Sequence, residues 1–321
     1  MKKLIIKHND AGQRVDKFLG KAFPSLPQSM MYKAIRTKNI KLNRKRCQIS
    51  DRLTEGDVLE VYLPDDVLSE PEYRYDFLKA SKNIEIAYED EHILIADKKP
   101  GVLVHPDNDY QTDTLIARIH RYLYEKGEYN PDEENSFAPA LVNRIDRNTG
   151  GLVIAAKTAA ALRILNQKMK DREIHKEYLC IVHGKVRPKE ATLTGYLVKN
   201  EEQNRVYIDS KPSPDAKTIR TKYLVLAERN NLSLMHIDLL TGRTHQIRAH
   251  MASVGHPLLG DGKYGTNALN KGTGYTKQAL YSYRLTFEFT TDAFELAYLD
   301  GKVVQAKNVP FLSEFPDYRL G

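Results

Sequence analysis

The sequence predicts an α+β fold: a large domain with a mixed, mainly antiparallel β-sheet and peripheral helices, preceded by a small α/β module. Beyond residue 84, strand-like segments outnumber helical ones and do not alternate with them, as a doubly wound parallel sheet would require. Before residue 64, the apolar spacing indicates two short helices and then two strands. A stretch rich in proline and acidic residues separates these parts. We therefore expect a module at 1–66, a linker at 67–83 and a domain at 84–321.

The small module is predicted from short segments with clear apolar periodicity. Helices are expected at 14–19 and 29–37, and strands at 40–43 and 58–63. Between the two strands, Arg44, Lys45 and Arg46 form a strongly basic turn.

The large domain is predicted from helix caps and short apolar strands. Asp113 or Thr114 is expected to cap a helix that ends at Gly127, and Thr158 to cap a second helix. Residues 128–139 are expected to form a polar loop. The strands are expected at 91–97, 152–156, 177–182, 221–226, 232–240 and 285–290.

Positive charge is concentrated in the N-terminal module. The chain holds 49 Lys and Arg against 42 Asp and Glu, a net charge of +7. Residues 1–63 hold 14 Lys and Arg and 6 Asp and Glu, a net charge of +8, so the remaining 258 residues carry a net charge of −1. Clustered positive charge in a folded segment favours a nucleic-acid ligand, although a basic surface can also serve solubility alone.

The absence of several patterns disfavours other classes of protein. No run of about 18 apolar residues occurs, so we expect no membrane-spanning helix. The only cysteines, Cys47 and Cys180, lie in ordinary segments, which favours a reducing cytoplasm over a disulfide framework. His-Glu-x-x-His, Cys-x-x-Cys and Gly-x-Ser-x-Gly motifs are missing, and no Gly-x-Gly-x-x-Gly follows a predicted strand. We therefore expect a cytoplasmic protein without a metal site, a dinucleotide cofactor or a serine-hydrolase site.

A polar segment that ends in glycines, residues 141–151, leads into the strand expected at 152–156. A loop on such a rigid base suits a functional side chain. Asp146 lies between Arg144 and Arg147 in this segment, and a nearby guanidinium would favour an ionised carboxylate that acts as a nucleophile or base. Spacing alone leaves open that Asp146 is a structural residue in an ion-paired turn.

A second polar segment follows a predicted strand, and a helix is expected to begin in it near Arg243. That helix would carry Arg243, Gln246 and His250 on one face, and His245 and Arg248 on a neighbouring face. Arginine, histidine and glutamine at a helix N-terminus suit contacts with phosphate or carboxylate, although a solvated amphipathic helix shows the same pattern.

Two further segments are ambiguous from spacing. Tyr178, in the strand expected at 177–182, is either a core aromatic residue or a platform on which a base stacks. Residues 255–265 are rich in glycine but do not match the phosphate-loop fingerprint, so we interpret them as a structural turn.

Residues 143–152, Asn-Arg-Ile-Asp-Arg-Asn-Thr-Gly-Gly-Leu, resemble the signature of the RluA-type pseudouridine synthases, approximately His-Arg-Leu-Asp-x-x-Thr-Ser-Gly-Leu. Further motifs of the family follow its order over roughly residues 84–290: Lys99-Pro100-Gly101 to His105-Pro106, Lys176 to Gly184, Thr241 to Arg248, and Gly255 to Gly265. Residues 14–63 resemble the small RNA-binding module that precedes the catalytic domain in many of these enzymes. The sequence departs from the family pattern at Asn143, Ile145 and Gly150, and at Leu280-Tyr281-Ser282 where Leu-His-Ala is common.

The resemblance implies an enzyme that isomerises specific uridines in structured RNA to pseudouridine. It implies that Asp146 is the catalytic aspartate, that Arg248 pairs with it, that Tyr178 stacks on the target base, and that Arg144 helps to displace the target nucleotide. Further contacts with RNA are expected from Arg243, His245, Arg44, Lys45 and Arg46.

The expected reaction adds and removes no atom, so it needs no redox cofactor, energy source or metal. Whether the carboxylate attacks the ribose, attacks the base or removes a ribose proton stays open.

Large-subunit ribosomal RNA is the expected substrate by analogy with relatives that carry the same module, with transfer RNA second; we expect a monomer without membrane partners. The alternatives are a non-catalytic RNA-binding or ribosome-assembly factor on the same scaffold, and a glycoside or nucleoside hydrolase, which needs a second catalytic carboxylate.

Overall fold

The computed structural model describes residues 1–69, 74–107, 111–200, 202 and 205–320, so Pro71 of the expected linker lies outside the described residues. The α-helices are α1 (Val15–Ala22), α2 (Gln28–Arg36), α3 (Leu115–Lys126), α4 (Ala159–Asp171), α5 (Gln246–Ser253) and α6 (Asn267–Asn270). Short 3-10 helices are η1 (His8–Asp10), η2 (Asp65–Val67), η3 (Asp76–Lys79), η4 (Pro131–Glu133), η5 (Phe294–Leu299) and η6 (Pro310–Glu314). The strands are β1 (Lys2–Ile5), β2 (Ile40–Leu42), β3 (Lys45–Arg46), β4 (Val58–Val61), β5 (Ile86–Glu89), β6 (Ile93–Lys98), β7 (Ala140–Leu141), β8 (Gly150–Ala156), β9 (Ile174–His183), β10 (Glu190–Asn200), β11 (Arg205–Asp209), β12 (Lys217–Arg229), β13 (Leu232–Asp238), β14 (Leu280–Phe287) and β15 (Val303–Gln305).

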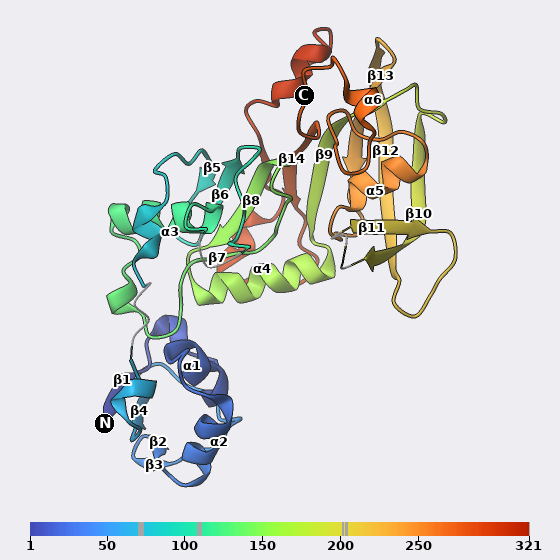
Figure 1. Ribbon diagram of the computed structural model, residues 1–321. Helices are drawn as coiled ribbons and strands as arrows, with labels where there is room; N and C mark the ends of the chain where they lie inside the picture. The colour runs from blue at the N-terminus through green and yellow to red at the C-terminus, as the bar shows by residue number, and fades with distance from the viewer. Residues whose placement is uncertain (70–73, 108–110, 201, 203–204, 321) are drawn as a thin grey trace.

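The N-terminal part folds around a four-stranded antiparallel sheet with the strand order β1-β4-β2-β3. Helices α1 and α2 lie beside this sheet (Figure 1). Phe18 of α1, Ile35 of α2 and Leu59 of β4 belong to one buried cluster. The predicted helices and the strands near 40 and 58 are present. Strand β1 was not expected; it pairs with β4.

The rest of the chain builds an eleven-stranded sheet with the order β11-β10-β12-β13-β9-β14-β8-β6-β5, to which β15 adds beside β14 and β7 beside β8. Among the described strands, β14 and β8 run parallel and the other pairs run antiparallel. The α+β prediction with a mixed, mainly antiparallel sheet is therefore confirmed.

Helices cover both faces of the large sheet (Figure 1). Because side chains alternate along a strand, Ile154 of β8 packs with Leu165 of α4 on one face, whereas its neighbour Val153 packs with α3 on the other. Helix α5 packs with Tyr178 of β9, in a third cluster. Ile145 contacts both the α3 cluster and the α5 cluster, so the loop that carries Asp146 crosses the sheet between these two helices.

Local signals placed two helices correctly. Thr114 Oγ1 accepts a hydrogen bond from Ala117 N at 3.3 Å, and Thr158 Oγ1 accepts one from Ala161 N at 3.1 Å. Gly127 ends α3 with a φ of 78°. These side-chain caps and the left-handed glycine satisfy backbone groups that the helix ends leave unpaired.

The helix expected from Arg243 begins later, which corrects its predicted face. Helix α5 starts at Gln246 because His245 adopts a left-handed φ of 55°, which interrupts the helical backbone. Arg243 therefore precedes the helix and does not share a helical face with His250. Two other differences are the β10–β11 hairpin, which was not anticipated, and β14, which begins at Leu280 and not at 285.

The parallel pairing of β8 with β14 depends on two glycines. Gly151 has a φ of 112°, and a Cβ there would lie 2.1 Å from the carbonyl oxygen of Ser282. A Cβ at Gly150 would lie 2.4 Å from Cε2 of Tyr281. The Tyr281 hydroxyl donates to Asp97 Oδ1 at 2.6 Å. The strand that follows the Asp146 loop can approach β14 only because neither glycine carries a side chain.

The N-terminal part contacts the large domain through a polar interface. Asp10 is fully buried and accepts hydrogen bonds of 2.6 Å from both Asn135 Nδ2 and Ser136 Oγ. The backbone N–H of Ala159, the first residue of α4, donates to Asn9 Oδ1 at 3.0 Å. The segment expected to form a polar loop thus holds the N-terminal part beside α4.

Among the described residues, no helix has both the length and the apolar character needed to cross a bilayer. Cys47 and Cys180 are buried free thiols.

Candidate active site

A pocket of about 720 Å³ lies where the loop before β8, strand β9 and the segment before α5 meet. Each of these elements was singled out in the sequence. The pocket is lined by the sequence-predicted residues Arg144, Asp146, Tyr178, Arg243, His245 and Arg248.

Asp146 and Arg248 form an ion pair at the base of this pocket. Arg248 Nη1 donates to Asp146 Oδ2 at 2.9 Å, although 102 residues separate the two in sequence. Asp146 Oδ1 accepts no hydrogen bond from the described residues, and 23% of the Asp146 side chain is exposed. One carboxylate oxygen is thus held by the guanidinium, while the other is open to a ligand. Neither sequence neighbour, Arg144 or Arg147, pairs with Asp146.

The guanidinium of Arg248 is oriented by a second carboxylate that sequence analysis missed. Asp261 is fully buried and accepts from Arg248 Nε at 2.7 Å and from Nη2 at 2.9 Å. Burial acts to raise the pKa of Asp261, but the bonds from Arg248 outweigh it and the pKa is lowered. Residues 255–265, interpreted as a structural turn, therefore contribute a charged group behind the site.

His245 lies near the same Asp146 oxygen that Arg248 binds. Its Nε2 is 3.9 Å from Asp146 Oδ2, and its Nδ1 is 3.0 Å from the hydroxyl of Tyr264. Burial lowers the pKa of His245 more than Asp146 raises it, which favours a neutral imidazole at pH 7.

Tyr178, Arg144 and Arg243 line the pocket in different environments. Tyr178 is 5% exposed, and burial raises the pKa of its hydroxyl to about 12, so the side chain is a neutral aromatic surface. Arg144 and Arg243 are exposed and form no ion pair within the described part of the chain. Both guanidinium groups are thus free to contact an anionic ligand.

A buried lysine supports the Asp146 loop from below. Lys98 Nζ donates to the carbonyl oxygens of Val102 and Arg147 at 2.9 Å and of Lys99 at 3.3 Å. Burial lowers the pKa of Lys98 to about 7. Because Arg147 follows Asp146, these bonds fix the backbone beside the carboxylate. The lysine precedes the Lys99-Pro100-Gly101 motif and was not singled out.

Gln246 fixes the turn that carries Arg243. Its Oε1 accepts from Thr241 Oγ1 at 2.8 Å and from the backbone N–H of Arg243 at 3.1 Å. Its Nε2 donates to the carbonyl oxygen of Arg220 at 3.0 Å. The side chain predicted to face a ligand is therefore a buried support of this turn.

The basic turn of the N-terminal part belongs to the other sheet (Figure 1), and its residues are not among those that line the pocket. Asn43 and Arg44 both have positive φ, the geometry of a two-residue turn between β2 and β3. Arg44, Lys45 and Arg46 are exposed, and their side chains form no ion pair within the described ranges.

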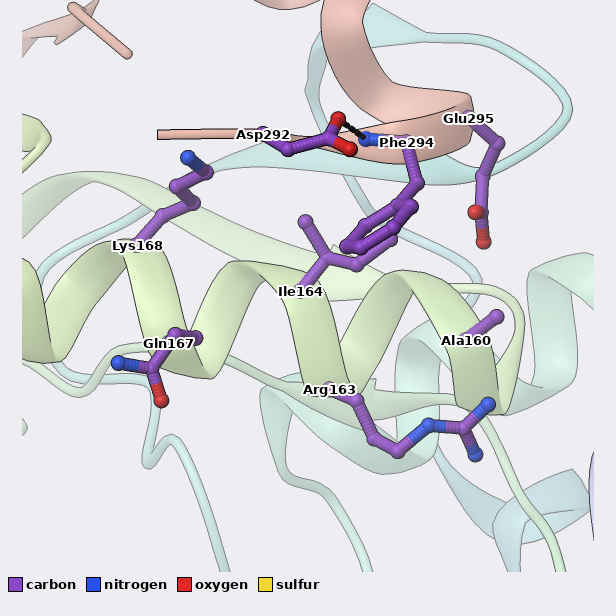
Figure 2. A pocket seen from close by; sticks show the side chains of 8 residues that line it. All are labelled: Ala160, Arg163, Ile164, Gln167, Lys168, Asp292, Phe294 and Glu295. Carbon is purple, nitrogen blue, oxygen red and sulfur yellow. Dashed lines mark hydrogen bonds between the residues drawn. The ribbon is translucent and has the colours of Figure 1, made fainter. Parts of the chain in front are cut away.

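A smaller pocket of about 360 Å³ lies between α4 and the start of η5 (Figure 2). Asp292 Oδ1 accepts from the backbone N–H of Phe294 at 2.8 Å, and Lys168 Nζ donates to Glu173 Oε2 at 2.6 Å. These polar groups are engaged in structural contacts. The larger pocket is therefore the better candidate for an active site.

We expect His250, behind the pocket, to reduce the stability of the folded protein as the pH is lowered. His250 is 2% exposed, its Nδ1 lies 3.0 Å from Thr221 Oγ1, and burial lowers its pKa to about 4. The unfolded state, with a His pKa near 6.5, binds a proton more readily. The free energy of unfolding should thus lose about 3 kcal/mol from this group between pH 6.5 and pH 4.

Urea unfolding of wild type and His250→Gln across this pH range measures the effect. A smaller loss in the variant is the expected result, because glutamine does not titrate. Equal pH dependence of both proteins would contradict the assignment.

The family model for RNA pseudouridylate synthase matches residues 92–253, which include the Asp146 loop, β9 and α5. An uncharacterized RNA pseudouridine synthase of Mycoplasma genitalium is 32% identical over 294 residues, covering 89% of this chain and 88% of the relative. The ribosomal large subunit pseudouridine synthase C of Buchnera aphidicola is 34% identical over 263 residues, covering 80% of this chain and 79% of that protein. The enzyme of the same name from Vibrio cholerae is 30% identical and covers 90% of this chain and 89% of that protein.

Solved structures show the same fold. Human RNA Pseudouridylate Synthase Domain Containing 4 has a TM-score of 0.56 and 17% identity, covering 71% of this chain and 90% of that chain. Human RNA Pseudouridylate Synthase Domain Containing 1 has a TM-score of 0.53 and 21% identity, covering 78% of this chain and 98% of that chain. The sequence motifs, the pocket and these matches lead to one conclusion: the chain belongs to the RluA-type family of RNA pseudouridine synthases.

Proposed function

We propose that this enzyme isomerises uridines of large-subunit ribosomal RNA with Asp146 as its catalytic carboxylate and without a cofactor. The observation that carries the proposal is the pocket in which Asp146, Arg248 and Tyr178 meet. Formation of pseudouridine breaks the bond between ribose and base, rotates the uracil and joins the ribose to the C5 atom. The product has the same atoms and oxidation state as the substrate, so the reaction needs no redox partner and no energy source.

Asp146 has the environment that this chemistry needs. The proposed chemistry needs a carboxylate that attacks the ribose or the base, or removes a proton, and Arg248 Nη1 holds the Asp146 carboxylate in place at 2.9 Å. Its free Oδ1 is the atom we assign to the reaction, because Oδ2 is held by Arg248. Asp261 keeps Arg248 in place during the reaction, since it binds the other side of the guanidinium.

The target uracil must leave the RNA stack before it reaches Asp146, at a cost of a few kcal/mol. We assign Tyr178 as the surface on which the base stacks, because its ring lines the pocket beside Asp146. We assign Arg144, exposed two residues before Asp146, to the space that the base leaves in the RNA. Arg243 and His245 then lie at the wall of the pocket, where they can contact the sugar and phosphate.

The choice of ribosomal RNA is supported by two relatives whose names describe large-subunit synthases; transfer RNA is the second candidate. The experiment maps pseudouridines in total RNA from cells that lack the protein. Sites that disappear, and that return with wild type but not with Asp146→Ala, identify the substrate. If every site persists in the deletion strain, the proposal is wrong.

We propose that residues 1–66 bind RNA as a unit, with Arg44, Lys45 and Arg46 as phosphate contacts. Replacing all three by glutamine is expected to weaken RNA binding and to flatten its salt dependence by up to about one log unit for each lost phosphate contact. Filter binding at several salt concentrations measures this slope. Lys79→Gln, which removes an exposed charge already paired with Asp76 at 2.7 Å, is the matched control. An unchanged slope in the triple variant would place the turn outside the RNA interface.

A non-catalytic RNA-binding factor is the weaker alternative. Such a protein has no need for a carboxylate with one oxygen held by an arginine and the other open to a pocket. A hydrolase of glycosides or nucleosides would need a second carboxylate in the pocket. Asp261 does not fill that role, because it is fully buried behind Arg248.

A further inference from the structure

Beyond the residues that line the pocket lies an arginine that the mechanism above does not use. Arg205 is the first residue of β11 and pairs with Asn200 of β10. Its guanidinium carbon lies 5.0 Å from the ring centre of Tyr264 and 5.6 Å from that of Tyr207. Its Nε is buried and has no hydrogen-bond partner, and the side chain forms no ion pair within the part of the chain that the structure describes.

This environment positions the Arg205 guanidinium without neutralising it. Contacts with the faces of aromatic rings hold a cation through the quadrupole of the ring, and they leave its N–H groups unbonded. A buried N–H without an acceptor is unfavourable and rare in native proteins. A planar guanidinium held in this way is ready to bind a phosphate through two parallel hydrogen bonds.

Tyr264 connects Arg205 to the candidate active site. The guanidinium carbon of Arg248 lies 5.1 Å from the same ring, and the Tyr264 hydroxyl is 3.0 Å from His245 Nδ1. The backbone N–H of Val206 donates to this hydroxyl at 3.0 Å. One tyrosine thus joins the β10–β11 hairpin to the groups that surround Asp146.

Positively charged side chains gather around Tyr264: the guanidinium carbons of Arg205 and Arg248 lie 5.0 and 5.1 Å from its ring centre. Lys263 precedes Tyr264, and burial together with the charges of Arg248 and Arg205 lowers the pKa of Lys263. Two carboxylates close to Lys263, those of Asp146 and Asp261, are both bonded to Arg248. An additional anion beside Arg205 would therefore be attracted, and RNA supplies one phosphate per nucleotide.

We propose that Arg205 forms a binding subsite for a phosphate of the RNA backbone next to the target uridine. The inference rests on the proposed function, because it assumes that an RNA strand enters this pocket. A nucleotide that flips out rotates about its own backbone, so the adjacent phosphates must be held to keep the strand in register. The basic turn of the N-terminal part belongs to the other sheet and does not line this pocket.

The test measures binding of a fluorescein-labelled oligouridylate to the full chain by fluorescence anisotropy between about 50 and 300 mM KCl. Loss of one contact between a cation and a single-stranded phosphate makes the slope of log affinity against log salt concentration shallower by about 0.7. The same loss reduces the affinity about fivefold at 0.1 M salt. We expect this change in Arg205→Gln. Arg205→Lys keeps the charge and should keep the slope. Arg319→Gln removes one exposed arginine charge far along the chain and should also keep it.

If folded Arg205→Gln keeps the wild-type salt slope, the proposal is overturned. It is also overturned if Arg205→Lys and Arg205→Gln lower the slope equally, because that result indicates a packing role for the side chain. Thermal unfolding checks the fold. If Arg205→Gln does not fold, Lys263→Gln tests the same cluster and should reduce the slope likewise. The salt slope is measured without turnover, so it tests the phosphate subsite alone. The proposed function is tested separately, by whether the wild-type protein forms pseudouridine in transcribed ribosomal RNA. If it forms none, the proposed function is refuted, whatever the slope shows.

Discussion

Replacing Asp146 by asparagine is expected to abolish pseudouridine formation while RNA affinity stays within about threefold of wild type. Asparagine has the shape of aspartate, and its carbonyl oxygen can still accept the bond that Arg248 Nη1 donates at 2.9 Å. It carries no charge, so the neutral amide cannot act as nucleophile or base. Loss of such a group typically reduces turnover by about 10⁴-fold or more, because it acts in the transition state and not in binding.

Two readouts separate the chemistry from the binding. Pseudouridine formation replaces the hydrogen on C5 of uracil, so release of tritium from C5-labelled RNA measures turnover, and filter binding measures affinity. Asp317→Asn, at an exposed aspartate near the C-terminus, is the control and should retain both. Turnover by Asp146→Asn at a rate near that of wild type would rule out Asp146 as the catalytic residue.

The second large effect is expected from Asp261→Asn, although Asp261 does not touch the pocket. Asp261 binds Arg248 through two hydrogen bonds, and Arg248 binds Asp146 with its remaining nitrogen. Breaking a buried ion pair by removing one partner costs about 3–5 kcal/mol of stability. A guanidinium that is free to turn also no longer holds Asp146, so we expect kcat to fall by about 10²- to 10³-fold, as when one preorganised electrostatic partner is lost.

Glu173→Gln is the matched control for Asp261→Asn. Glu173 is buried and pairs with Lys168 at 2.6 Å beneath the other face of the sheet, so its loss should also reduce stability. Turnover per folded molecule should fall only in Asp261→Asn, with KM for RNA nearly unchanged. If the two variants lose turnover equally, Asp261 has a structural role alone.

Much of the fold follows from local signals in the sequence. Thr114, Thr158 and Gly127 each satisfy backbone groups within a few residues, so their positions predict where α3 and α4 begin and where α3 ends. The apolar residues of β6 and β8 likewise form runs that require burial on both faces. The β10–β11 hairpin was missed because its strands are largely polar and their pairing is determined by the contacts with β12 and Tyr264.

The site is less predictable because its contacts join distant segments. Spacing offered Arg144 and Arg147 as possible partners of Asp146 and left the pairing open, whereas Arg248 is the residue that binds it. Only the family resemblance indicated that pair. Asp261 stood in a segment whose glycines suggested a turn, and nothing in its neighbours reveals a bond to a residue on α5. Gln246 was assigned to a ligand-facing surface because the left-handed backbone of His245 has no clear signature in the sequence.

The close approach of Tyr281 to Gly150 links two of the differences between this chain and its family pattern. The pattern has serine or threonine in place of Gly150 and histidine in place of Tyr281. A side chain at position 150 would occupy the volume that the phenol ring now fills, since its Cβ would lie 2.4 Å from that ring. The two differences from the pattern therefore compensate each other where β8 meets β14. The larger ring of Tyr281 on β14 fills the space that a side chain at position 150 of β8 would need.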